Sequence, residues 1–202
     1  MAAVEAVVFD VGRVIVEWDL QLIWKDTIPD EAARRHFVAT VVTEEWHATH
    51  DAGRDLDEML AERIALFPDH APHIRRYADR FADSIPGTVP GSVDLIDALA
   101  AAGVPLYAIT NFAHRFWQEF RPTLPVFRHF RDVVVSGTEK LAKPDPAIFH
   151  LAARRFGHAP QAMLFIDDNA ANIAAAQALG WQVHHFTDAA RLADDLEARA
   201  LI

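Results

Sequence analysis

The sequence predicts an α/β fold: a doubly wound parallel sheet with a helical-bundle cap inserted near its start. Three observations support this prediction. A run of β-branched and aromatic residues at 4–9 indicates a buried strand. Helical patterns then fill residues 17–85, and from residue 92 onward helical and strand-like segments alternate, as they do in parallel sheets. We therefore expect a core made of residues 1–16 and 86–202 and a cap made of residues 17–85.

Four helices are expected in the cap, each from an apolar face and three of them with a capping residue. Asp19 precedes the first helix, Asp30 the second, and Asp55 or Asp57 the third. Residues 84–91 are dense in proline and glycine and predict the linker back to the core. The four apolar faces consist of Leu20, Ile23 and Trp24; of Ala33, Phe37, Val38 and Val41; of Met59, Leu60, Ile64 and Leu66; and of Ile74, Tyr77, Ala78 and Phe81.

The rest of the core is predicted from regular alternation. Glycines at 103 and 180 end two of its helices. The expected helices are 92–102, 114–120, 145–156, 169–179 and 188–200, and the expected strands are 104–110, 132–136, 162–166 and 183–186.

Composition limits the classes of function. The chain has 202 residues and a formal net charge of −10, which gives no electrostatic reason to expect nucleic acid or an anionic membrane as partner. The lack of cysteine excludes disulfides, thiolate nucleophiles and cysteine-ligated zinc. We see neither a secretion signal nor an apolar run of the roughly 18 residues that a membrane span needs. We expect a cytoplasmic monomer or homodimer whose small anionic substrate is met by local positive charge or a metal ion.

Polar side chains gather where the predicted strands end. In an open α/β sheet the carboxyl ends of the strands form the edge at which ligands bind. We therefore expect one constellation of a carboxylate, a hydroxyl and amide pair, a lysine and an acidic pair. Its members are Asp10, Thr110, Asn111, Lys143, Asp167 and Asp168.

This constellation suits phosphoryl transfer to an aspartate. Crowded carboxylates are most readily stabilised by a divalent cation, and hard oxygen ligands favour Mg²⁺. Asp10 would attack phosphorus, and water would then release the aspartyl phosphate. Thr110 and Asn111 can donate hydrogen bonds to phosphate oxygens, while Lys143 supplies positive charge to the phosphate and to Asp10.

In order and residue type, these stretches resemble the four motifs of the haloacid dehalogenase superfamily. The matching runs are Phe-Asp-Val-Gly at 9–12, Ile-Thr-Asn at 109–111, Lys-Pro-Asp-Pro-Ala-Ile-Phe at 143–149 and Phe-Ile-Asp-Asp-Asn-Ala-Ala-Asn-Ile at 165–173. The resemblance covers essentially the whole chain and implies a Rossmann-like core, a helical cap and a phosphoric monoester phosphatase. Gly12 and the last run are most similar to bacterial sugar-phosphate phosphatases that act on substrates such as glucose 1-phosphate.

The resemblance also implies a role for each residue. Asp10 would be the nucleophile and a Mg²⁺ ligand, Asp168 a second direct ligand, and Asp167 a ligand either directly or through water. The backbone carbonyl of Gly12 would supply a further oxygen. The phosphate would be held by Thr110, Asn111 and Lys143.

One position departs from the family pattern. Most phosphatases of this superfamily carry a second aspartate two residues after the nucleophile, as general acid and base, whereas this chain has Gly12. A positioned acid or base contributes roughly 10²–10⁴-fold, so its loss would slow the reaction and matter least for a leaving group of low pKa. The residues considered as substitutes are Glu17, Asp19, His47 and His50.

Two other functions compete with the phosphatase. A 2-haloacid dehalogenase would share the fold and the nucleophilic aspartate, but it attacks carbon without a metal and has no use for both Asp167 and Asp168. A weakly active binding or regulatory domain is the other alternative, because Gly12 replaces the usual acid. Arg13 would either bind an anionic substrate or pair with a cap carboxylate, and Trp18 is a candidate to line the cleft.

Overall fold

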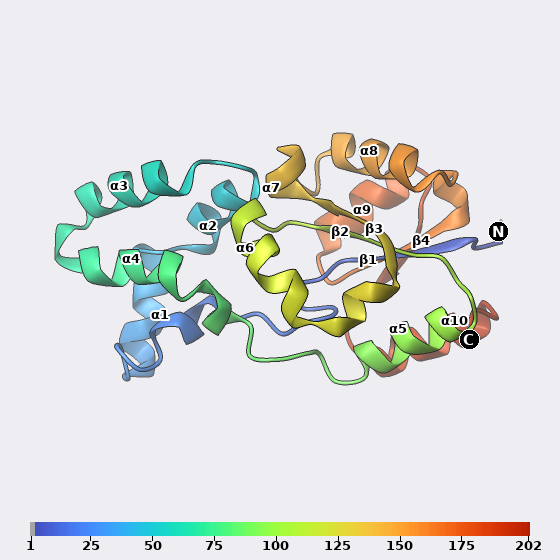
Figure 1. Cartoon of the computed structure of the whole chain (residues 1–202), viewed down its shortest axis with the longest axis horizontal. Helices are drawn as coiled ribbons and strands as arrows, with labels where there is room; N and C mark the ends of the chain where they lie inside the picture. Colours follow the sequence, from blue (N-terminus) through green and yellow to red (C-terminus); the bar gives the residue numbers. More distant parts are fainter. Residues whose placement is uncertain (1–2) are drawn as a thin grey trace.

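A five-stranded parallel sheet in the order β3-β2-β1-β4-β5 forms the centre of the protein (Figure 1). The computed structural model describes residues 3–202. The strand order reverses at β1, which pairs with β2 on one side and β4 on the other. Such a reversal opens a crevice beyond the carboxyl ends of the strands. The strands are β1 Ala6–Phe9, β2 Leu106–Thr110, β3 Phe130–Val135, β4 Met163–Asp167 and β5 Gln182–His185.

Helices cover both faces of the sheet, which confirms the predicted doubly wound α/β class. In Figure 1, α8 and α9 lie on one face and α5 and α10 on the other. The alternating side chains of β1 enter separate apolar clusters: Val7 and Phe9 on one face, Ala6 and Val8 on the other, all fully buried. The core helices are α5 Ser92–Ala101, α6 His114–Phe120, α7 Ser136–Glu139, α8 Pro146–Phe156, α9 Ala170–Ala178 and α10 Ala189–Ala198.

A helical cap follows β1, as the sequence predicts, and extends to one side of the sheet (Figure 1). Asp30 and Asp55 cap two of its helices, because their carboxylates accept hydrogen bonds from the backbone N–H groups of Ala33 and Glu58. The cap helices are α1 Glu31–Thr40, α2 Glu44–Asp51, α3 Leu56–Leu66 and α4 Ala71–Asp79. Short 3₁₀ turns occupy Leu20–Trp24, Pro68–His70, Phe81–Ser84, Arg121–Thr123, Pro125–His129 and Pro160–Ala162.

Two details of the cap differ from the prediction. The first expected helix is a 3₁₀ turn, Leu20–Trp24, although Asp19 caps it as expected. Helix α2 was not among the four expected helices, because it has no apolar stripe; its buried face consists of Trp46, His47, His50 and Asp51. A polar sequence whose polar face is buried does not show the periodicity from which a helix is predicted.

The chain leaves and re-enters the core along paired segments. Val16 forms an antiparallel bridge with Thr88, and the N–H of Glu17 donates to the carbonyl of Gly87 at 3.0 Å. We propose that the boundary between core and cap lies at this pairing. Within residues 3–202, none of the helices is both long and apolar enough to cross a membrane.

Candidate active site

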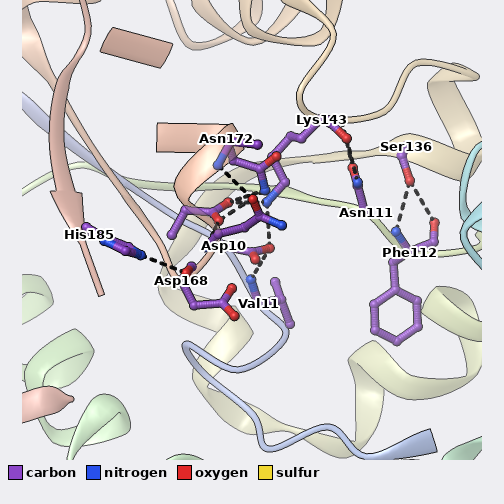
Figure 2. A network of polar contacts seen from close by, with 12 residues as sticks. Asp10, Val11, Asn111, Phe112, Ser136, Lys143, Asp168, Asn172 and His185 are labelled. Atoms are coloured by element: carbon purple, nitrogen blue, oxygen red, sulfur yellow. Dashed lines mark hydrogen bonds and ion pairs between the residues drawn. The ribbon is translucent and has the colours of Figure 1, made fainter. Parts of the chain in front are cut away.

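Asp10 lies immediately beyond β1, at the point where the strand order reverses. The residue is 8% exposed, and Oδ1 accepts hydrogen bonds from the backbone N–H of Val11 at 2.7 Å and from the Lys143 ammonium at 2.8 Å (Figure 2). These contacts fix the orientation of the carboxyl group. The end of a fully buried strand therefore places one oriented carboxylate in the crevice.

Lys143 is the cation of the site, and it binds two carboxylates. Its Nζ lies 2.8 Å from Asp10 Oδ1 and 2.7 Å from Asp167 Oδ2. Burial lowers the pKa of this ammonium, but the charges of Asp10 and Asp167 raise it by more, so the pKa lies above its ordinary value. Lys143 is consequently protonated at neutral pH.

The side chain of Asn111 holds the backbone of Lys143. Its amide N–H donates to the Lys143 carbonyl, and its Oδ1 accepts from the Lys143 N–H, each at 2.9 Å (Figure 2). The phosphate-binding role expected for Asn111 stays a prediction, since this side chain positions the lysine. Thr110 is 1% exposed at the end of β2, and its hydroxyl has no hydrogen-bond partner within the described part of the chain. Because this hydroxyl is buried and Thr110 is not among the residues that line the cavity over Asp10, its phosphate-binding role stays a prediction.

The two acidic residues after β4 have different surroundings. Asp167 is fully buried, and its oxygens accept from Lys143, from the N–H of Asn169 at 2.8 Å and from the amide of Asn172 at 3.0 Å. Asp168 is half-buried, and its backbone carbonyl accepts from His185 Nε2 at 2.9 Å (Figure 2). Asn172 lies in the fourth motif, but the sequence alone predicts no role for it. The carboxylate of Asp167 is therefore held by three partners, and the expected roles of Asp167 and Asp168 as Mg²⁺ ligands stay predictions.

The carboxylates fit a divalent cation. One oxygen each of Asp10, Asp167 and Asp168 can be chosen so that all three lie within 4.8 Å of one another. Burial raises the pKa of Asp10 to about 7, although Lys143 opposes the shift. Burial, and then the charge of Asp167, raise the pKa of Asp168. Carboxylates that are costly to ionise together are the hard oxygen set that Mg²⁺ prefers.

A cavity of about 220 Å³ lies over these groups, between the core and the cap. This volume is below the ~300–1,000 Å³ usual for ligand pockets, which favours a small ligand. Trp18 lines it, as its position after the first motif suggests. The core contributes Asp10, Gly12, Asn111, Lys143, Asp168 and Asn172, and the cap contributes Trp18, Glu44, His47, Asp51 and Phe81.

None of the four candidates for the missing acid or base is poised over Asp10 among the described residues. Glu17 and Asp19 are exposed and do not line the cavity. His47 lines it, but its Nδ1 lies 2.7 Å from Tyr77 Oη and its Nε2 lies 3.1 Å from Asp51 Oδ2. His50 lines a different cavity. The cap instead brings to the site a carboxylate, Asp51, that the sequence analysis did not single out, because it ends the unexpected helix α2.

Arg13 lies at the edge of the same cavity and contacts the cap. Its guanidinium donates to Glu44 Oε1 at 3.0 Å and lies 4.8 Å from the centre of a Trp18 ring. Of the two expectations for Arg13, the structure shows the pairing with a cap carboxylate. This ion pair is exposed on both sides and therefore contributes little to stability.

Comparison with known proteins places the sequence in a family. The haloacid dehalogenase-like hydrolase family matches residues 4–180. Phosphoglycolate phosphatase of Escherichia coli K12 is 37% identical over 87 residues, 43% of this chain, and that match spans about a third of the relative's length. A probable phosphoglycolate phosphatase of Pseudomonas putida is 29% identical over 90% of this chain and 65% of its own.

Solved structures share the fold. A HAD family enzyme of Bacteroides thetaiotaomicron, crystallised with magnesium and inorganic phosphate, superposes with a TM-score of 0.68. The alignment covers 92% of this chain and 96% of that chain, at 17% sequence identity. This likeness confirms the predicted α/β fold.

Proposed function

This chain belongs to the haloacid dehalogenase-like hydrolase family, and we propose that it is a Mg²⁺-dependent phosphatase of a small phosphorylated metabolite. The observation that most supports this proposal is that Lys143 Nζ contacts Asp10 Oδ1 at 2.8 Å and Asp167 Oδ2 at 2.7 Å. Both Asp10 and Lys143 line the cavity. A carboxylate held against a fixed ammonium is oriented for attack on phosphorus. Relatives named as phosphatases, and a structural neighbour with bound magnesium and phosphate, support the proposal.

The proposed reaction consists of two successive displacements at phosphorus. The Asp10 carboxylate attacks phosphorus while the bond to the leaving oxygen breaks, and the leaving alkoxide takes a proton from water. Water then attacks the phosphorus of the aspartyl phosphate and releases inorganic phosphate and the free Asp10 carboxylate. The Lys143 ammonium would neutralise charge on the equatorial phosphate oxygens. The Thr110 hydroxyl would orient them by donating a hydrogen bond.

Mg²⁺ would be held by Asp10 and Asp168, with Asp167 and the carbonyl of Gly12 as further candidate oxygens. When bound, the ion would supply charge neutralisation between the nucleophile and the phosphate. Since Asp167 already accepts hydrogen bonds from Lys143, Asn169 and Asn172, we assign it the role of orienting Lys143. Asp168, as a Mg²⁺ ligand, thus has a use that carbon attack in a metal-free dehalogenase would not require.

The leaving group is expected to be a good one. Because residue 12 is glycine, no acid is placed there to protonate the leaving oxygen. Departure is slowed least for an alkoxide whose conjugate alcohol has a low pKa. An anomeric sugar phosphate such as glucose 1-phosphate meets this condition. Phosphoglycolate, the substrate in the names of two relatives, is the comparison compound.

Phosphate release tests the proposal. Wild type and Asp10→Asn are assayed on glucose 1-phosphate, phosphoglycolate and p-nitrophenyl phosphate, with Mg²⁺ or with chelator, and Asp94→Asn serves as an exposed carboxylate control. We expect Mg²⁺-dependent turnover by wild type and the control, and none by Asp10→Asn. Undiminished turnover by Asp10→Asn would refute the proposal. Mg²⁺ binding without phosphate release would favour the regulatory-domain alternative, and halide release from 2-chloropropionate would favour the dehalogenase.

A further inference from the structure

Asp51 is a buried carboxylate in the cap wall of the catalytic cavity. The residue is 7% exposed, and it lines the same cavity as Asp10. One of its oxygens, Oδ2, lies 3.1 Å from His47 Nε2. The other, Oδ1, is buried and has no hydrogen-bond partner among residues 3–202. Leaving a buried acceptor unpaired is costly, so native proteins keep few of them, and each calls for an explanation.

A chain of hydrogen bonds fixes the orientation of Asp51. Tyr77 Oη lies 2.7 Å from His47 Nδ1. Burial, and then the charge of Asp51, raise the pKa of Tyr77 well above its ordinary value, so the phenol keeps its proton. Tyr77 can therefore donate to Nδ1, which leaves the proton of His47 on Nε2 to donate to Asp51 Oδ2. Trp18 stacks on His47 at 5.2 Å between ring centres and restrains the imidazole.

The core fixes the position of Asp51 from the other side. The hydroxyl of Ser136, at the start of α7, donates to the backbone carbonyl of Asp51. The same hydroxyl accepts from the N–H of Phe112 at 2.9 Å, in the loop that follows Thr110 and Asn111. The last residue of α2 is therefore joined to the loop that carries the predicted phosphate-binding residues. A side chain oriented from the cap and positioned from the core is preorganised for a ligand.

From these observations we infer that Asp51 determines substrate specificity, by accepting a hydrogen bond at Oδ1 from a hydroxyl group on the organic part of the substrate. The inference rests on the proposed phosphatase function. It assigns the substrate to the polyol or sugar monophosphates, whose hydroxyls can donate to a carboxylate. A substrate with a carboxylate in that position would meet like charge from Asp51 and Glu44, with Arg13 already paired to Glu44.

Matched pairs of substrates isolate this hydrogen bond. Glycerol 1-phosphate is compared with propyl phosphate, and inositol 1-phosphate with cyclohexyl phosphate, so that each pair has the same carbon skeleton with and without hydroxyls. The quantity measured is the ratio of kcat/KM within a pair, for wild type, Asp51→Asn and the control Glu45→Gln. Glu45 is an exposed carboxylate of the same helix. Comparing ratios between variants cancels the intrinsic reactivity of each phosphate ester.

We expect wild type and Glu45→Gln to prefer the hydroxylated member of at least one pair. In Asp51→Asn this preference falls roughly 10- to 100-fold, the value of a hydrogen bond to a charged acceptor. The loss is larger on the hydroxylated ester than on the ester without hydroxyls or on p-nitrophenyl phosphate. Tyr77→Phe, which removes the hydroxyl that orients His47, shifts the preference in the same direction by less, and it replaces Asp51→Asn if that variant does not fold.

Three results would overturn the inference while leaving the phosphatase intact. The first is a wild type without preference for hydroxylated esters, and the second is a wild type that prefers phosphoglycolate to both polyol phosphates. The third is an equal loss on every substrate in Asp51→Asn, which would indicate a structural or proton-transfer role for Asp51. Failure of wild type to hydrolyse p-nitrophenyl phosphate with Mg²⁺ would instead refute the proposed function itself.

Discussion

Gly12 lies two residues beyond Asp10 and lines the cavity, and its backbone leaves room for a side chain. A Cβ atom built at this position meets no described atom within 4 Å, and Gly12 is not among the glycines of positive φ. An aspartate can therefore be introduced here without backbone strain. The site therefore has room for an acidic side chain at position 12, and it lacks one because that residue is glycine.

Gly12→Asp is accordingly expected to increase activity. With an acid placed beside the nucleophile, kcat should rise by about 100-fold for alkyl phosphates, the lower end of the usual range for general acid catalysis. p-Nitrophenyl phosphate, whose leaving group needs no proton, should gain little. Steady-state kinetics on both esters check this, with Gly87→Asp as a control at a second glycine with open space around it. An equal change on the two esters would speak against general acid catalysis by the introduced aspartate.

Asp10 also links stability to pH. Because burial raises its pKa from 3.8 to about 7, the folded protein binds this proton more tightly than the unfolded chain does. The group's contribution to stability is therefore greatest below pH 3.8 and is lost as the pH rises towards 7. At higher pH the folded protein bears the full cost of an ionised, buried carboxylate.

Thermal unfolding with and without Mg²⁺ measures this linkage. A cation that binds the ionised carboxylates should raise Tm more at about pH 8 than at about pH 5. In chelator at about pH 8, Asp10→Asn should be more stable than wild type, since it removes the buried charge and keeps the pair of Lys143 with Asp167. A lower Tm for Asp10→Asn under these conditions, or an equal Mg²⁺ effect in both proteins, would contradict this expectation.

The strand-end residues could be predicted from the sequence, but their contacts could not. Asp10, Thr110 and Asp167 end strands whose apolar runs are plain, so parallel topology alone brings them to one edge. The use of Asn111 to clamp the Lys143 backbone depends on the path of the loop before α8. Likewise, only the fold shows that Asn172 donates to Asp167. Asn111 and Lys143 are distant in sequence, and the spacing of Asp167 and Asn172 matches neither a helical nor a strand period.

Among the elements, α2 links the cap to the catalytic edge, and a core hydroxyl contributes to the connection. Ser136 is fully buried, and its hydroxyl bonds to the Asp51 carbonyl and the Phe112 N–H. Ser136→Ala should lower the free energy of unfolding by about 1–3 kcal/mol, the cost of leaving buried polar groups unpaired. Urea denaturation measures the difference.

Ser92→Ala is the matched control for that experiment. Ser92 is also buried, at 1% exposure, but its hydroxyl has no hydrogen-bond partner among the residues described. Its replacement by alanine should leave stability unchanged or raise it, because an unpaired buried hydroxyl is removed. Equal losses in the two variants would show that the link from α2 to the core through Ser136 adds nothing beyond the burial of a serine.

At the scale of elements, the sequence predicts every strand of the sheet, and it misses only short or polar helices. Helix α7 has four residues, too few to show a period. Helix α2 buries histidines and a carboxylate where an apolar stripe would normally lie, because its inner face serves the cavity as well as the core. The prediction of helices from the sequence thus fails at α2, whose buried face lines the candidate site. Functional sites are where such failures are expected.

At the scale of the whole molecule, core and cap share one apolar cluster. Phe81 at the end of the cap stacks on Phe116 of α6 at 4.0 Å between ring centres, and Tyr77 meets Phe116 edge-on at 5.6 Å. The cluster continues through Trp24 in the cap to Phe9 in β1. A cap packed in this way stabilises the core and is stabilised by it.

Unfolding should therefore be a single cooperative transition. The buried apolar residues of the cap belong to the same cluster as those on one face of the core sheet, so we expect neither part to unfold without exposing the other. Circular dichroism, which follows all helices, and tryptophan fluorescence, which follows Trp24 and Trp46 in the cap as well as Trp117 and Trp181 in the core, should give the same midpoint. Two separated transitions would show that the cap unfolds independently.

Capture of the phosphorylated enzyme tests the nucleophile most directly. Wild type is mixed with p-nitrophenyl phosphate and Mg²⁺, quenched in acid within one turnover, and digested for peptide mass mapping. We predict one phosphoryl group on the peptide that contains Asp10, labile to hydroxylamine as an acyl phosphate is, and absent from Asp10→Asn. A phosphoryl group on another carboxylate, or full turnover by Asp10→Asn, would contradict the assignment of Asp10 as the nucleophile.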